Sequence, residues 1–216
     1  MSFIEYLTAP GTIDVLIEQS LEHIWLVVVP IVLATIIAMV LGIIAHRSSL
    51  LRGPIMNTTS LILTIPSLAL FAALIPYLGI GNRPVIVALT GYALLPIARN
   101  TLAGLQSVDP AMIESARGMG MGNAQRLLQM ELPVAWPVIL TGIRVATQLT
   151  VGIAAVAALI GGGGLGNEIY NGIRRIGSVG ATESIFGGTL AILILALLFD
   201  ALYQVIGRLT TSKGLQ

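Results

Sequence analysis

The charged and polar side chains capable of chemistry gather in residues 109 to 137, a stretch set between long apolar runs. Within it, Glu114 and Arg117 lie three residues apart, a spacing at which the two side chains can pair across one helical turn. Gly118 and Gly120 follow, and glycines weaken a helix and permit a sharp bend. An acid, a base and a bend suit a compact docking surface rather than a catalytic site.

Two short helices are expected within this stretch. Asp109 and Pro110 are typical of a helix start, with Asp as the N-cap and Pro in the first helical position. Asn123 can cap a second helix over residues 124 to 130. Pro133 then returns the chain toward the next apolar run, followed by a second proline four residues later.

The chain lacks the residue patterns that metal, phosphate-binding or catalytic sites would require. The chain has no cysteine, which excludes disulfides and thiolate metal sites. His23 and His46 lie far apart beside an apolar run, which favours interfacial polar residues over metal ligands. Residues 161 to 166 read GGGGLG, but no GK[ST] follows, so this is not a phosphate-binding loop. The apolar runs contain no Ser/His, Cys/His or paired-carboxylate set for catalysis.

Composition places the chain in a membrane. Of its 216 residues 56% are hydrophobic and 10% charged, whereas soluble domains have about 25% charged residues. The net charge of +1 gives no nucleic-acid footprint. We therefore predict an all-α, polytopic membrane protein with a single domain over residues 1–216.

Five apolar segments are long enough to cross a bilayer, which takes about 20 residues. They are residues 24–45, 55–77, 85–105, 138–160 and 185–206, with the polar loop at 107–137 between the third and fourth. Before the first span, acidic residues recur every four positions in residues 12–22. This pattern predicts an amphipathic helix on the outer interface, or alternatively a contact for a solute receptor.

Positive charge sets the orientation. The first 22 residues contain no Lys or Arg, which argues against a cleavable signal peptide and for an outward-facing N-terminus. Five spans then put the polar loop and the C-terminus in the cytoplasm. Most of the basic residues then lie near the inner face, as the positive-inside rule requires: Arg47, Arg52, Arg99, Arg117, Arg126, Arg144, Arg208 and Lys213, against Arg83, Arg174 and Arg175 outside.

A few residues inside the spans are candidates for a translocation pathway or gate. Pro66 frees a backbone carbonyl in mid-span, which Thr64 and Ser67 are placed to satisfy; the alternative is simple helix packing. Tyr92 is the one aromatic residue proposed for pathway contact, again with packing as the alternative. The glycine run, with Gly163 and Gly164, is expected to be an unwound outer segment beside the mouth.

Two intramembrane charges call for partners. Arg99 and Asp200 both fall in the inner third of their spans. We hypothesise that they pair with each other, or that each ties its helix to the polar loop. Snorkelling of each side chain to the interface is the alternative.

Two motifs of the polar loop resemble the EAA loop of ABC importer permeases. They are ESARG at residues 114–118, where Ser115 stands in place of the usual alanine, and ELP at residues 131–133. Further segments at 64–71, 93–101, 142–144 and 160–166 extend the resemblance over residues 20 to 207. Together they look like the permeases for glycine betaine, choline, carnitine and related osmoprotectants.

The resemblance implies a function and a set of partners. The loop would be a coupling helix seated in a cleft of a cytoplasmic ATPase dimer, through Glu114, Ser115, Ala116, Arg117, Gly118, Gly120, Leu132 and Pro133. ATP and Mg²⁺ would bind that ATPase, leaving this chain without cofactor or catalysis. An extracytoplasmic solute-binding protein, a second permease chain (identical or paralogous), membrane lipid and a bacterial inner membrane complete the expectation.

Two alternatives remain from the sequence. The runner-up is an ABC permease for an amino acid such as methionine, which shares chain size and loop. A secondary transporter is disfavoured, because such proteins commonly need a carboxylate at mid-span and none stands there.

Overall fold

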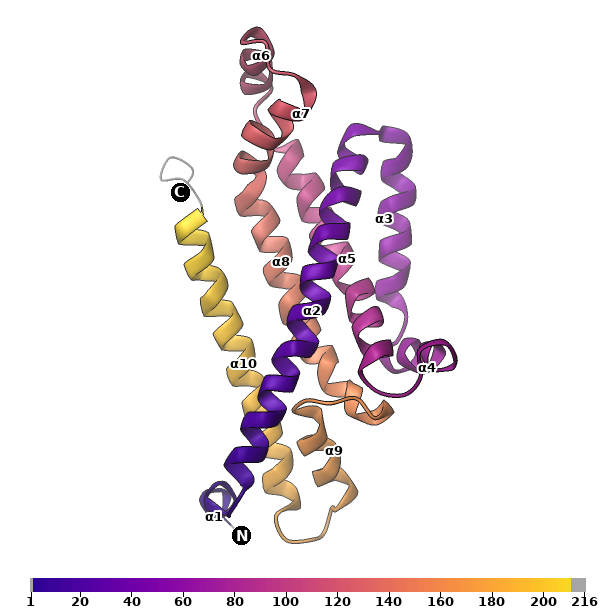
Figure 1. Cartoon of the computed structure of the whole chain (residues 1–216), viewed down its shortest axis with the longest axis vertical. Coiled ribbons are helices and arrows are strands. Elements are labelled where there is room, and N and C mark those ends of the chain that lie inside the picture. Colours follow the sequence, from indigo (N-terminus) through magenta and orange to yellow (C-terminus); the bar gives the residue numbers. More distant parts are fainter. Residues whose placement is uncertain (1, 211–216) are drawn as a thin grey trace.

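The computed structural model describes residues 2–210, which form a long helical bundle (Figure 1). The helices are α1 (Phe3–Thr8), α2 (Thr12–Arg47), α3 (Ser49–Thr64), α4 (Ser67–Leu78), α5 (Asn82–Gln106), α6 (Pro110–Gly118), α7 (Asn123–Arg126), α8 (Leu132–Ala154), α9 (Gly166–Arg174) and α10 (Ala181–Thr210). A π-helical turn, η1 (Leu127–Glu131), joins α7 to α8, and a 3₁₀ turn, η2 (Ala155–Ile160), ends α8.

The described helices give four candidate membrane spans, or five if the bent pair α3–α4 counts as one. The unbent candidates are α2, α5, the continuous helix over residues 123–160, and α10. In Figure 1 the N-terminal end of α2 and the C-terminal end of α10 lie at opposite ends of the bundle. Helices α6 and α7 project beyond the bundle at the end where α10 finishes.

Helix α5 packs against both α2 and α8, and glycines allow the close approach. A Cβ added at Gly42 of α2 would lie 2.6 Å from the Cβ of Thr101, and one at Gly142 of α8 would lie 2.5 Å from the Cβ of Asn100. Carbon atoms in contact normally stand about 3.5–4.0 Å apart. Small residues at helix interfaces are how membrane bundles pack closely. Helices α2, α5 and α8 therefore form the tight centre of the fold.

Residues 12–22 do not form a separate interfacial helix, so that prediction is wrong. They are the first turns of α2, which continues unbroken for 36 residues, about 54 Å at the rise of an α-helix. The chain bends earlier, at Gly11, whose φ of 81° suits glycine. No glycine or proline interrupts the helix between Gly11 and Pro30, so the span simply extends outward with Asp14 and Glu18 exposed.

The segment predicted as one span at 55–77 is broken. Helices α3 and α4 meet at an angle of 97°. The break falls at Pro66, which restricts the preceding residue to an extended conformation; Ile65 has φ −70° and ψ 130°. A proline in mid-span thus produces a sharp bend rather than a mild kink.

The fourth span begins much earlier than the predicted 138–160. Residues 123–160 are one continuous helical segment, and neither Pro133 nor Pro137 interrupts it. The wider π-helical turn of η1 immediately precedes Pro133, where a proline ring would otherwise clash with a carbonyl four residues back. The predicted cap is also wrong: Gly122 occupies the N-cap position, and Asn123 is the first helical residue.

Candidate coupling site

Helix α6 begins as the sequence predicts. Asp109 is the N-cap, and its Oδ1 accepts the backbone N–H of Ala111 at 2.8 Å. Pro110 fills the first helical position, where a missing N–H costs nothing. Such a cap contributes about 1 kcal/mol, which matters for a helix of nine residues that has few neighbours.

The end of α6 depends on Gly120. Its φ is 83°, its N–H donates to the Arg117 carbonyl at 2.9 Å, and the Met121 N–H donates to the Ala116 carbonyl at 3.1 Å. This pair of bonds is the Schellman arrangement, which needs a left-handed residue between them. Gly118 has no such requirement, and a Cβ added there would meet nothing within 4 Å. The two glycines predicted to weaken the helix, Gly118 and Gly120, therefore differ, and the turn itself requires Gly120.

The side chains of α6 are free to meet another protein. Glu114, Ser115 and Arg117 are exposed, whereas Ala116 is buried. The expected pairing of Glu114 with Arg117 is wrong, since within residues 2–210 no ion pair joins them. Apolar side chains accompany these charges: Met112, Met119 and Leu128 are 43%, 72% and 65% exposed.

The buried carboxylate of Glu131 fixes the α6–α7 loop to the bundle. No role of its own was predicted for this residue from the sequence. Glu131 is 1% exposed, and its Oε1 accepts Arg126 Nε at 2.7 Å. Arg47, at the end of α2, donates Nη2 to both oxygens of Glu131 at 3.2 Å. His46 Nε2 stands 4.0 Å from the same carboxylate. We call Glu131, Arg126 and Arg47 the Glu131 cluster.

The Glu131 cluster makes α7, η1 and the end of α2 one mechanical unit. Leu132, the next residue, packs against the apolar core, and Pro133 is exposed beside it. Ion pairs therefore connect α7 and η1 to α2, and the continuous helix connects them to α8. The sequence signal was a lone acid beside the Leu-Pro pair, with its arginine partner five residues before it.

The residues at the break between α3 and α4 are held by hydrogen bonds. The hydroxyl of Tyr92 on α5 donates to the carbonyl of Ile65 at 2.8 Å, and Tyr92 is 1% exposed. Thr64 bonds instead to the carbonyl of Leu61, at 2.7 Å. Tyr92 therefore anchors the break in this conformation, while Pro66 is exposed and Ser67 half-buried beside it.

The glycine run is unwound, as expected, and buried beneath a carboxylate. Glu22 Oε2 accepts the N–H of Gly164 at 2.9 Å, and Asn82 Oδ1 accepts that of Gly163 at 2.8 Å. Asn82 Nδ2 in turn donates to Glu22 Oε1 at 3.2 Å. A Cβ added at Gly163 would overlap the Glu22 carboxylate. Glu22 and Asn82 therefore join α2 and α5 to the glycine run. Neither residue was identified from the sequence.

Glu168, a buried acid of α9, joins the N-terminal helix α1 to the bundle. Glu168 of α9 accepts the Tyr6 hydroxyl at 2.8 Å, Gln19 Nε2 at 3.2 Å and the Ser184 hydroxyl at 2.8 Å. Burial, together with the hydrogen bond to Glu168, raises the pKa of Tyr6 to about 12. The Tyr6 hydroxyl therefore keeps its proton and remains a donor at physiological pH.

The proposed pairing of Arg99 with Asp200 is wrong. Asp200 pairs with Arg144, whose Nε and Nη2 donate to its two oxygens at 2.6 and 2.8 Å. Arg99 is exposed on α5. Arg99 and Arg144 stand at comparable depth, because both lie within two residues of the contact between Gly142 and α5, so depth alone did not select the partner. The selection is made by packing, because α10 lies against α8, which carries Arg144.

The described helices thus form a membrane bundle with one broken candidate span and a loop, α6 and α7, that projects beyond the bundle. Residues 19–212 match the family described as binding-protein-dependent transport system inner membrane component, and the chain belongs to this family.

Individual transport proteins and a solved structure are also similar to this chain. The chain is 39% identical to the choline transport system permease protein OpuBB of Bacillus subtilis, over 93% of this chain and 91% of that protein. It is 40% identical to the osmoprotectant import permease protein OsmW of Salmonella typhimurium, over 93% and 94%. Among solved structures, the inward-facing MetNI methionine ABC transporter matches with a TM-score of 0.84 at 22% identity, covering 95% of this chain and 100% of that one. At this identity the structural match establishes the shared fold alone.

Proposed function

We propose that this chain is the permease subunit of an ATP-driven importer of osmoprotectants such as glycine betaine, choline or carnitine. The observation that carries the proposal is identity of 38–40% over 93% of the chain to relatives named for these solutes. The methionine transporter shares the fold at 22% identity, which says nothing about the solute. Methionine is therefore the competing solute that an assay must exclude.

The distribution of arginines supports a cytoplasmic position for the α6–α7 loop. The loop end of the bundle carries Arg47, Arg52, Arg117, Arg126 and Arg208, whereas Arg83, Arg174 and Arg175 mark the opposite end. Under the positive-inside rule the loop and the end of α10 face the cytoplasm, and α1 faces outward. Lys213, also predicted inside, lies outside the described residues. The membrane would be the inner membrane of a bacterium.

Coupling would be mechanical. Helix α6 would sit in a cleft of one subunit of an ATPase dimer, which binds ATP and Mg²⁺. The exposed charges of Glu114 and Arg117 and the exposed methionines of the loop supply polar and apolar contacts for that cleft. Movement of the ATPase would displace α6, and the Glu131 cluster would transmit the displacement to α2 and α8.

Two further partners complete the assembly. Five spans are too few to enclose a solute path, so a second permease chain, identical or paralogous, would form the other half. An extracytoplasmic solute-binding protein would deliver the solute at the end that carries α9. The broken span at Pro66 and the buried glycine run remain candidates for the pathway and its gate.

The test is uptake by the reconstituted assembly. Proteoliposomes containing this permease, its ATPase and its binding protein should accumulate labelled choline, glycine betaine or carnitine only when ATP is supplied inside. Uptake of methionine alone would replace the proposed solute class. Uptake driven by an ion gradient without the ATPase would place the chain among secondary transporters and overturn the proposal.

A further inference from the structure

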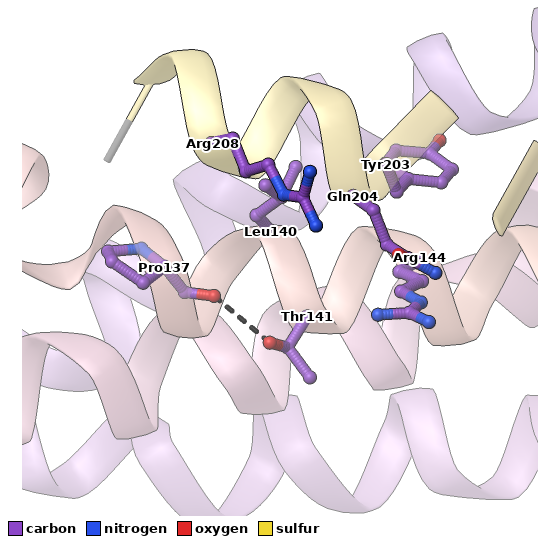
Figure 2. A pocket seen from close by; sticks show the side chains of 8 residues that line it. Pro137, Leu140, Thr141, Arg144, Tyr203, Gln204 and Arg208 are labelled. Carbon is purple, nitrogen blue, oxygen red and sulfur yellow. Dashed lines mark hydrogen bonds between the residues drawn. The ribbon is translucent and has the colours of Figure 1, made fainter. Parts of the chain in front are cut away.

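A cavity of about 380 Å³ opens between α8 and α10 at the loop end of the bundle. Its polar lining consists of Thr141 and Arg144 from α8 and Tyr203, Gln204 and Arg208 from α10. Figure 2 shows Arg144 and Arg208 reaching from opposite helices toward the same space. The function proposed above does not use this cavity.

The cavity carries an unbalanced positive charge. Asp200 neutralises Arg144 through the two bonds already described, and Gln204 Nε2 donates to the same carboxylate at 3.0 Å. Arg208 has no hydrogen bond or ion pair with any residue between positions 2 and 210. A guanidinium presents five donors, so Arg208, with the Nη1 of Arg144, leaves several donors available. An occupant with negative charge and several acceptor oxygens fits this lining.

The cavity begins at the level of a membrane interface. Trp136 Nε1 donates to Thr210 Oγ1 at 2.8 Å, and Thr210 lies two residues after Arg208 on α10. Tryptophan concentrates at membrane–water interfaces, where its ring lies among headgroups. Gln204, which lines the cavity, lies four residues before Arg208 on α10, about 6 Å deeper. The lining thus extends from headgroup depth into the region of the acyl ester groups.

The outer surface beside the cavity suits lipid chains. Leu202, Val205 and Leu209 on α10 are 50%, 52% and 80% exposed. A phospholipid would place its phosphate at Arg208, its ester carbonyls near Gln204 and its chains along these residues. A zwitterionic solute has no net charge to balance Arg208, and free phosphate has nothing to cover the apolar side chains.

We infer that the cavity between α8 and α10 binds the headgroup of an anionic phospholipid, with Arg208 as the main phosphate ligand. Basic pockets between spanning helices on the cytoplasmic side have the chemistry for such headgroups. With the proposed orientation this lipid belongs to the inner leaflet. The binding itself depends on neither the ATPase nor the solute.

The experiment measures lipids retained by the purified full chain. The permease is equilibrated in nanodiscs containing equal phosphatidylglycerol and phosphatidylcholine, and native mass spectrometry then counts the lipids that remain bound. The wild type should retain phosphatidylglycerol preferentially. R208Q should lower that preference about fivefold, since one basic residue near the surface contributes about 1 kcal/mol, while R208K should keep most of it. R83Q, which removes an exposed arginine at the other end, is the matched control and should match the wild type.

Several outcomes would overturn the inference. Equal retention of the two lipids by the wild type would do so, as would an unchanged preference in R208Q. Displacement of phosphatidylglycerol by millimolar inorganic phosphate would assign the cavity to a free anion, and displacement by glycine betaine would assign it to the solute. Because no transport is measured, failure here leaves the uptake assay above untouched.

Discussion

The Glu131 cluster permits the sharpest prediction, E131Q. The Glu131–Arg126 pair is 2.7 Å long, with side chains 1% and 3% exposed. The substitution keeps the shape of the side chain but leaves the Arg126 charge buried without its counter-ion. Breaking a buried pair in this way costs about 3–5 kcal/mol. Arg47 Nη2 lies 3.2 Å from Glu131 Oε2, but the Arg47 side chain is 37% exposed and therefore in contact with solvent. R47Q should lower the free energy of unfolding by about 1 kcal/mol or less.

The assay has a stability arm and a coupling arm. Equilibrium unfolding of the purified permease should show E131Q about 3 kcal/mol less stable than wild type, with R126Q similar and R47Q close to wild type. In proteoliposomes, E131Q should still support ATP hydrolysis by the ATPase while uptake falls, because α6 remains docked but α7 and η1 are no longer tied to α2. E114Q, on the exposed face of α6, is the matched control and should leave stability unchanged.

A double-mutant cycle supplies the refuting result. R126Q/E131Q removes both charges, so the double variant should be no less stable than either single variant, with a coupling energy of about 3 kcal/mol. Additive losses would mean that the two side chains act independently. Wild-type stability and uptake in E131Q would remove the cluster from the mechanism altogether.

Four further single substitutions and one double substitution test other parts of the structure. G118W should fold normally, because a side chain there meets open space, yet it should abolish uptake by blocking the ATPase cleft. G120A should instead lower the stability of the loop, because Gly120 has a φ of 83°, and faster proteolysis within the loop would show this. Y92F should destabilise the permease by about 1 kcal/mol, measured by unfolding, because the Ile65 carbonyl at the helix break loses its donor. D200N should lower the melting temperature and R144Q/D200N should recover it; an unaltered melting temperature in D200N would count against the pair.

Much of the fold follows from local signals in the chain. The predicted spans at 85–105 and 185–206 lie within α5 and α10, because uninterrupted apolar length is a property of the sequence alone. The start of α6 at Asp109 is equally local, since the cap and the N–H that it accepts are two residues apart. The sequence signalled a freed carbonyl near Pro66 but predicted one unbroken span there, so neither the break nor its 97° angle was foreseen.

The sequence alone could not predict which side chains on different helices pair with each other. Arg99 and Arg144 stand at comparable depth, and only the packing of α10 on α8 decides that Asp200 meets Arg144. The sequence left Tyr92 with two interpretations, pathway contact or packing, and only the structure shows its hydroxyl donating to the Ile65 carbonyl at the helix break.

By itself, the sequence determined that this is an apolar helical chain with a capped, glycine-ended polar loop, because hydropathy, caps and turns act over a few residues. Only the tertiary structure decided that Glu131 is buried between two arginines and that Glu22 covers the glycine run. These contacts join residues 84 and 142 positions apart in the chain. They exist because glycines let α2, α5 and α8 approach closely enough to bring those side chains together.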